Sequence, residues 1–224
     1  MSRTGRLNPY TEIHKAVRQA LFETEMRLGS TDWTDAEAIP GAVAAWRNLT
    51  ALLRDHVENE HNFVHPIYER KLPGVARSLN ADHEEQEAFL RELDGHFDRL
   101  LEMPPDDARV AMGLELYRAL SRFIADYLPH LLREEGVFLR NLWDVCSEEE
   151  IADMLAAIIA AESPESAVLS GEFILRASNH QDLRSLMEAI SGRVPAPVIE
   201  GMMQMAQQFL PPRELQKLAP APPG

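Results

Sequence analysis

Hydrophobic residues recur every three or four positions along most of this chain, in long segments separated by proline, glycine and short polar stretches. This is the period of an amphipathic α-helix rather than the strict alternation of a half-buried β-strand. Four long segments of this kind run over residues 9–28, 40–65, 75–102 and 107–143. Long helices joined by short or moderate loops predict an all-α protein built on an up-down four-helix bundle.

Two prolines bear on the ends and the shape of these helices. Pro66 disfavours helical backbone at the residue before it, so we expect the second helix to end near His65. Pro129 lies inside the fourth segment, one residue before His130, where we expect it to kink the helix.

The pattern changes after Cys146. Shorter helical segments follow, punctuated by proline and glycine, and Ser147 with three following acids reads as the start of the first of them. We therefore predict a bundle over residues 1–146 and a C-terminal appendage of shorter helices over 147–218, packed on the bundle or on a partner. The tail 219–224 is expected to be disordered.

A His followed four residues later by a Glu occurs inside three of the four long segments. The pairs are His56–Glu60, His83–Glu87 and His130–Glu134, and His14 lies in the remaining segment. Residues four apart lie on nearly the same face of a helix, so each pair directs an imidazole and a carboxylate to one place. Each pair also falls on the apolar stripe of its helix, where a carboxylate is costly unless it is paired or bound to metal.

The other histidines, and Glu135, fit this pattern less well. Composition predicts about one such pair by chance, and a fourth, His65–Glu69, is set aside because Pro66 follows at once. His61 lies about 140° round the helix from His56, so we expect it to face away. We expect the same of His65, His96 and His180. On the fourth helix we prefer Glu134 to the adjacent Glu135, since the i+4 position suits a long Glu.

Four imidazoles and three carboxylates are enough for two metal ions. Calcium prefers oxygen ligands throughout and structural zinc prefers four compact ligands, so the set favours iron or manganese over these two. Manganese or zinc is a possible substitute for iron at such a site. Two other metal motifs fail on residue count. HEEQE at His83 lacks the second His of a zinc-protease motif, and the chain has one ExxH where a ferritin-type site needs two.

Charge and cysteine content exclude several classes. A formal net charge of −14 argues against nucleic acid and anionic membrane surfaces as partners. The single cysteine, Cys146, excludes an intramolecular disulfide and a cysteine-ligated iron–sulfur cluster, and we expect it to pack as a small hydrophobe. No apolar segment is typical of a signal peptide or a membrane span, so we expect a cytoplasmic protein.

The order and spacing of these motifs resemble the hemerythrin-like (HHE cation-binding) family, over about residues 8–143. The motifs are His14, then HVENE, HEEQE and HLLREE. The resemblance implies a four-helix bundle with a non-haem di-iron centre, bridged by an oxo or hydroxo group. It implies that His14 and His56 bind one iron and that Glu60 and Glu134 bridge the pair. His83, Glu87 and His130 would bind the other iron.

Glu87 stands where the oxygen-carrying members of that family have a second His. A carboxylate ligand there would favour ferric iron, which weakens the case for reversible O₂ carriage. The resemblance therefore implies a protein that reacts with or senses O₂, peroxide or NO, with catalase-like peroxide breakdown as the most concrete activity. The alternative is a non-catalytic iron or oxygen sensor, or a partner-binding protein. In that alternative the C-terminal helices contact a protein partner or form a homodimer.

Overall fold

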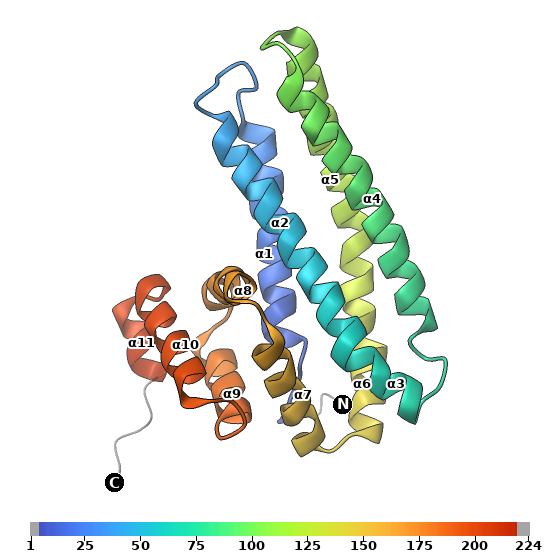
Figure 1. Cartoon of the computed structure of the whole chain (residues 1–224), viewed down its shortest axis with the longest axis vertical. Helices are drawn as coiled ribbons and strands as arrows, with labels where there is room; N and C mark the ends of the chain where they lie inside the picture. Colours follow the sequence, from blue (N-terminus) through green and yellow to red (C-terminus); the bar gives the residue numbers. More distant parts are fainter. Residues whose placement is uncertain (1–4, 219–224) are drawn as a thin grey trace.

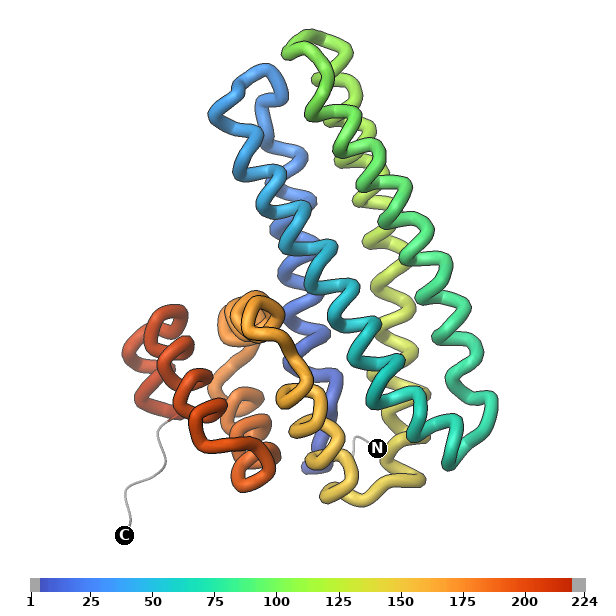
Figure 2. Tube along the Cα trace, viewed as in Figure 1, coloured from blue at the N-terminus to red at the C-terminus, as the bar shows by residue number. Residues whose placement is uncertain are grey.

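A four-helix bundle forms the body of the protein. The computed structural model describes residues 5–218, so the predicted disordered tail lies outside the described residues, and between those limits the chain contains no strand. Four long helices run side by side (Figures 1 and 2). They are α1 (Thr11–Ser30), α2 (Ile39–Asn59), α4 (Arg77–Glu102) and α5 (Asp107–Arg133). The all-α fold and the bundle are as the hydrophobic period predicts.

Two of these helices continue beyond a wide, π-helical turn. α2 passes into η1 (Glu60–Val64) and then α3 (His65–Lys71), and α5 passes into η2 (Glu134–Phe138) and then α6 (Leu139–Val145). Both π turns therefore begin at the Glu of a His–Glu pair.

The expected end of the second helix at His65 is wrong. Pro66 lies in the first turn of α3, where the missing N–H costs little and the fixed φ suits a helix. Pro129 lies inside α5, which continues through this residue to Arg133. The departure from α geometry comes at Glu134, five residues after Pro129.

Aliphatic and aromatic side chains from all four long helices form the main core. The indole of Trp46 stacks on Phe97, with ring centroids 5.7 Å apart, and Leu49 and Leu120 are fully buried. A second cluster surrounds the π turns and includes Tyr68, Phe138 and Cys146. Cys146 is buried as predicted, and burial raises the pKa of its thiol.

The C-terminal helices pack on the side of the bundle formed by α1 and α2. They are α7 (Glu148–Ala161), α8 (Pro164–Ala177), α9 (His180–Ile190), α10 (Ala196–Phe209) and α11 (Pro212–Leu218). Ser147 caps α7 in a capping box with Glu150, as its sequence predicts. α8 lies against α1 (Figure 1), and Phe173 of α8 belongs to the main core. The appendage thus shares apolar packing with the bundle.

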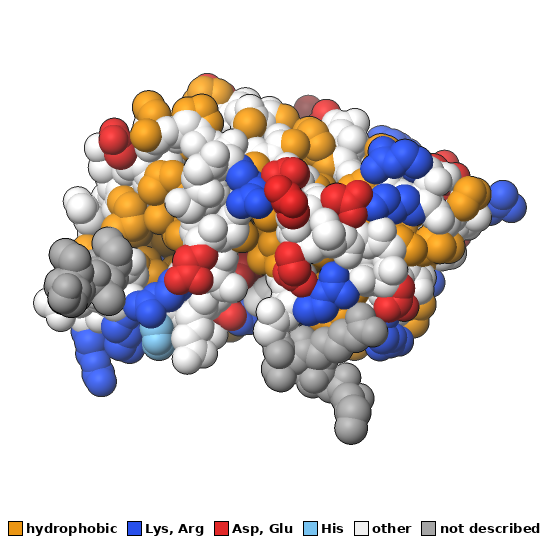
Figure 3. All heavy atoms as spheres, turned by 90° about the horizontal axis from the view of Figure 1, so that it is seen from below, with side chains coloured by type: hydrophobic (Ala, Val, Ile, Leu, Met, Phe, Trp, Pro, Cys, Tyr) orange, Lys and Arg blue, Asp and Glu red, His pale blue; other side chains and the backbone are white. Residues whose placement is uncertain are grey.

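Charged groups are mixed over the surface. In the view from below, acidic and basic side chains are interspersed over the visible face, with hydrophobic side chains between them (Figure 3). None of the helices within residues 5–218 has the length and apolar character needed to cross a membrane.

Candidate metal centre

Six of the seven predicted ligands meet inside the bundle, at the level where α2 and α5 pass into their π turns. They are His14 on α1, His56 on α2, Glu60 in η1, His83 on α4, His130 on α5 and Glu134 in η2. All six are buried, none being more than 4% exposed. Four separate helices thus bring imidazoles and carboxylates into one closed space.

Glu134 divides its two carboxylate oxygens between two histidines. Its Oε2 lies 3.4 Å from Nε2 of His14, and its Oε1 lies 3.2 Å from Nε2 of His130. Glu60 does the same on the other side. Its Oε1 lies 3.8 Å from Nε2 of His56, and its Oε2 lies 3.3 Å from Nε2 of His83.

Two overlapping groups of four ligands result, and both contain Glu60 and Glu134. One adds His14 and His56, the other adds His83 and His130, and within each group the ligand atoms lie within 4.8 Å of one another. Two carboxylates shared between two pairs of imidazoles match the donor set of two metal ions bridged by carboxylates.

The polar atoms of this cluster are not satisfied by the protein. Both carboxylate oxygens of Glu60 and of Glu134, and Nε2 of His14 and His56, are buried and accept or donate no hydrogen bond within the described chain. Buried polar groups are normally hydrogen-bonded, and buried charges are normally paired or bound to metal. The donors therefore fit a pair of metal ions, which would satisfy these atoms together.

Burial also prepares the cluster for cations. It lowers the pKa of His56 to about 3 and lowers that of His14, so both rings are neutral at pH 7 and their lone pairs are free to bind metal. Burial, together with the negative charge of Glu60, raises the pKa of Glu134. Two carboxylates held this close repel each other, and a cation between them removes that repulsion.

Carboxylates outside the cluster orient two of its histidines. Nδ1 of His14 lies 2.9 Å from Glu135, which Arg18 also contacts, and Nδ1 of His130 lies 3.0 Å from Asp82. A carboxylate at Nδ1 fixes the proton there and leaves Nε2 as the metal-binding nitrogen. The two neighbouring glutamates therefore have different roles. Glu134 points into the cluster, whereas Glu135 contacts Nδ1 of His14 on the side away from the cluster. The i+4 spacing indicated Glu134, but it gave no sign of the supporting role of Glu135.

Glu87 does not join the cluster in this structure. Its carboxylate binds Arg54 at 3.1 Å and Arg91 at 3.4 Å, and its side chain is 34% exposed. α4 carries Glu87 one helical turn beyond His83, and Arg54 on α2 lies opposite and draws the carboxylate outward. The expectation that Glu87 binds metal, and the ferric preference built on it, therefore has no support in this geometry.

His65 and His61 lie closer to the cluster than predicted. The ring of His65 stacks on that of His83 at 5.5 Å, its Nδ1 lies 2.7 Å from Asn80, and its Nε2 is buried without a partner. Nε2 of His61 lies 3.1 Å from Nδ1 of His83. Positions on an ideal α-helix placed both rings elsewhere, and the π turn of η1 changes that register because it fits an extra residue into one turn.

A polar opening reaches the cluster at His83. It has a volume of about 440 Å³, and His61, His83, Arg54, Glu87 and Tyr127 are among its lining residues. The hydroxyl of Tyr127 is buried and unpaired, and burial with the nearby charge of Glu134 raises its pKa well above the usual value. Tyr127 therefore keeps its proton and can donate it in a hydrogen bond to a small molecule entering here.

Comparison with known proteins gives one match. The family model of the hemerythrin HHE cation-binding domain matches residues 8–142. Comparisons with curated proteins and with solved structures gave no match. The matched range contains the whole cluster and ends before α7.

Proposed function

This chain belongs to the hemerythrin HHE cation-binding domain family, and we propose that it holds two iron ions with which it reacts with or senses O₂, peroxide or NO. Membership of the family and the buried His/Glu cluster support a metal-binding protein. The identity and number of the ions, and the ligand they meet, are our proposal.

The observation that carries this proposal is the sharing of Glu60 and Glu134 between two groups of histidines. In our assignment His14 and His56 would hold one ion, His83 and His130 would hold the other, and Glu60 and Glu134 would be available to both. A protein that needed one cation would not require four inward-facing imidazoles around two unsatisfied carboxylates. Manganese or zinc has the same donor requirements and could substitute for iron.

The residues around the cluster suit a small, uncharged ligand. Bound iron would supply an open coordination position and exchangeable electrons. The polar opening lined by His61 and His83 provides a route from solvent, and Tyr127 offers a hydroxyl donor at its inner end.

Within this function, catalase-like breakdown of peroxide is the activity that we propose to test. Protein purified without added metal is analysed for metal content, its near-ultraviolet spectrum is recorded, and peroxide turnover is measured. We expect about two irons per chain and turnover that is lost in His83→Ala. His96→Ala is the matched control, because His96 lies on the same helix but outside the cluster, with its Nε2 4.0 Å from Glu92. A single zinc per chain with no iron uptake under anaerobic loading would contradict the proposal.

A non-catalytic sensor is the second candidate, and one contact favours it. α1 carries His14 and is also the helix against which α8 packs. A change in metal occupancy that moves α1 would therefore reach the C-terminal helices, which in this candidate contact a protein partner or a second copy of the chain. Metal-dependent protection of residues 148–218 from hydrogen exchange, without peroxide turnover, would favour the sensor.

A further inference from the structure

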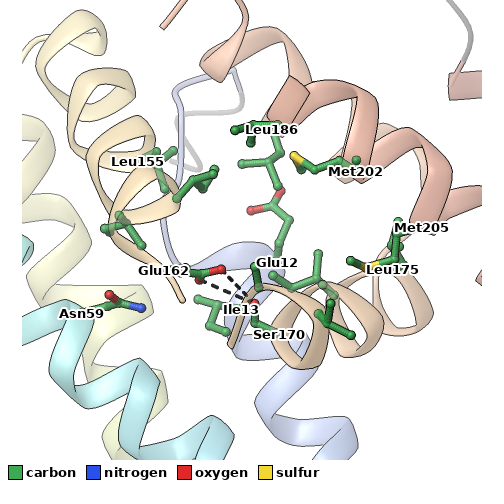
Figure 4. Close-up of a pocket in the computed structure, with 18 of the residues that line it drawn as sticks. Glu12, Ile13, Asn59, Leu155, Glu162, Ser170, Leu175, Leu186, Met202 and Met205 are labelled. Atoms are coloured by element: carbon green, nitrogen blue, oxygen red, sulfur yellow. Dashed lines mark hydrogen bonds between the residues drawn. The ribbon is translucent and has the colours of Figure 1, made fainter. Parts of the chain in front are cut away.

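A large cavity lies between the bundle and the C-terminal helices. Its volume is about 760 Å³, within the size range of small-molecule sites. Side chains of α7, α8, α9 and α10 surround it, and α1 forms its floor (Figure 4). Most of its lining is aliphatic or thioether, including Leu155, Leu175, Leu186, Met202 and Met205.

Glu12 points from α1 into this apolar space (Figure 4). Two positions along a helix correspond to about 200°, so Glu12 faces the C-terminal helices while His14 faces the metal centre. Glu12 is 8% exposed, and its carboxylate accepts a hydrogen bond from its own backbone N–H and from no other residue of the described chain. Lys15 and Asp182 influence it electrostatically, but these two pair with each other. A largely buried carboxylate with no side-chain partner is costly, and a ligand group could supply that partner.

A second carboxylate lies at the rim of the same space. Glu162 accepts a hydrogen bond from the hydroxyl of Ser170 at 3.2 Å, and burial raises its pKa (Figure 4). Asp55 and Glu60 also line the cavity, whereas no lysine or arginine within residues 5–218 does. The polar part of the lining is therefore acidic and without a cationic counterpart.

We propose that this cavity binds an apolar molecule carrying one protonated amino group. The amine would donate to the carboxylate of Glu12, and the hydrocarbon part would lie among the leucine and methionine side chains. A molecule with a carboxylate head would meet like charges and find no cation, and a pure hydrocarbon would leave Glu12 without a partner.

The cavity also reaches the metal centre, because His56 and Glu60 belong to both. An occupant would thus lie on the opposite side of the cluster from the polar opening at His61. Binding of the amine does not depend on which metal the centre holds, so this inference stands apart from the proposed function.

Three eight-carbon probes that differ in the head group test the inference. Octylamine, octanol and octanoate are titrated into the full-length protein, in the metal state in which it is purified, by isothermal titration calorimetry. We expect saturable binding of octylamine, weaker binding of octanol, and octanoate at least about tenfold weaker than octylamine, the effect of losing one charge-assisted hydrogen bond. Octanoate binding as tightly as octylamine, or no saturable binding of octylamine, would overturn the proposal.

Two pairs of variants locate the bound amine. Glu12→Gln should weaken octylamine about tenfold or more, whereas Glu149→Gln, an exposed acid of α7 outside the cavity, should not. Gly201 lines the cavity and a Cβ there meets nothing within 4 Å, so Gly201→Phe adds bulk at the lining without a clash at the Cβ. We expect it to reduce octylamine binding, while Gly95→Phe, equally unobstructed but on α4, leaves it unchanged. Unaltered affinity in both Glu12→Gln and Gly201→Phe, with melting temperatures near that of the parent, would show that the amine binds elsewhere.

Discussion

Glu60 and Glu87 occupy the same position in two His–Glu pairs, yet their surroundings differ completely. Glu60 is buried with both oxygens unsatisfied, whereas Glu87 lies on Arg54 near the surface. The residue pattern alone could not separate them, because the i+4 spacing fixes a helix face and says nothing of which neighbour on α2 lies opposite. Burial and the absence of a hydrogen-bond partner decide which carboxylate faces a cation.

The first prediction concerns these two glutamates. Glu87→Ala should keep the metal content of the parent. It should lower the free energy of unfolding by about 0.5 kcal/mol, the usual contribution of an exposed ion pair. Glu60→Ala should lose most of the metal, because it removes a carboxylate shared by both ligand groups. Elemental analysis of the two purified variants beside the parent measures this. Loss of metal in Glu87→Ala to the same extent as in Glu60→Ala would restore Glu87 as a ligand.

The second prediction concerns the stability of the metal-free protein in acid. Burial lowers the pKa of His56 to about 3 and that of His65 to about 4, and it also lowers the pKa of His14 and His61. Below about pH 6.5 the unfolded chain takes up protons that these folded imidazoles refuse. Stability should therefore fall as the pH falls from about 6.5 towards 4, by up to about 1.4 kcal/mol per pH unit for each such proton.

Three carboxyl groups act in the opposite sense. Burial raises the pKa of Glu12 to about 7 and raises those of Glu134 and Glu162, so these groups hold protons that the unfolded chain releases. The four imidazoles outnumber these three carboxyl groups, so we still expect the free energy of unfolding to fall as the pH falls. Urea unfolding of chelated protein at pH 7, 6 and 5 measures the slope, and His56→Gln should make it shallower. A stability that rises on acidification would contradict the sign.

At the scale of the elements, the two π turns account for most of what the sequence did not show. The hydrophobic period predicts four long helices and places the three His–Glu pairs on inner faces, and the structure agrees for every member of these pairs but Glu87. The period assumes 3.6 residues per turn, however, and a π turn shifts every following residue. A regular helix therefore predicts the wrong face for His65, and Pro66 does not end the helical path, because η1 and α3 continue it.

The third prediction concerns the contact between α3 and the second π turn, η2. Tyr68 of α3 is fully buried, and its hydroxyl donates a hydrogen bond of 2.8 Å to the carbonyl oxygen of Phe138 in η2. Tyr68→Phe leaves this carbonyl without that donor and should lower the free energy of unfolding by about 1 to 2 kcal/mol. Tyr117→Phe is the control, since Tyr117 is only partly buried and its hydroxyl has no hydrogen bond in the described structure. Chemical denaturation compares them, and equal stability of the two variants would count against a stabilising link between α3 and η2.

At the scale of the whole molecule, the metal centre and the C-terminal helices share the first helix. α1 presents His14 to the centre on one face, and on the other it receives α8, with Phe173 packed into the main core. The sequence predicts an appendage that begins at Ser147, but it gave no sign of the side on which this appendage packs. That choice depends on shape complementarity between helix surfaces far apart in the chain.

The fourth prediction concerns removal of the metal. Ligands come from α1, α2, α4 and α5, so bound metal links all four helices, and ions that bind only the folded state add their binding free energy to its stability. A site at a free metal concentration of about one hundred times its Kd adds about 2.7 kcal/mol, or roughly 5 to 10 °C in Tm for a chain of this size. Chelation should therefore lower the Tm clearly, as measured by calorimetry before and after treatment.

Glu134→Gln separates the two causes of that change. It keeps the size of the side chain and removes the cost of burying a second carboxyl group beside Glu60, whether that group is charged or must hold a proton, so chelated Glu134→Gln should melt above the chelated parent. It also removes a charge that both ions share, so chelation should lower its Tm less than that of the parent. If chelation removes the metal completely and leaves the parent's Tm unchanged, the ions are not bound among these buried carboxylates, because a site of this kind cannot be emptied without exposing its repulsion.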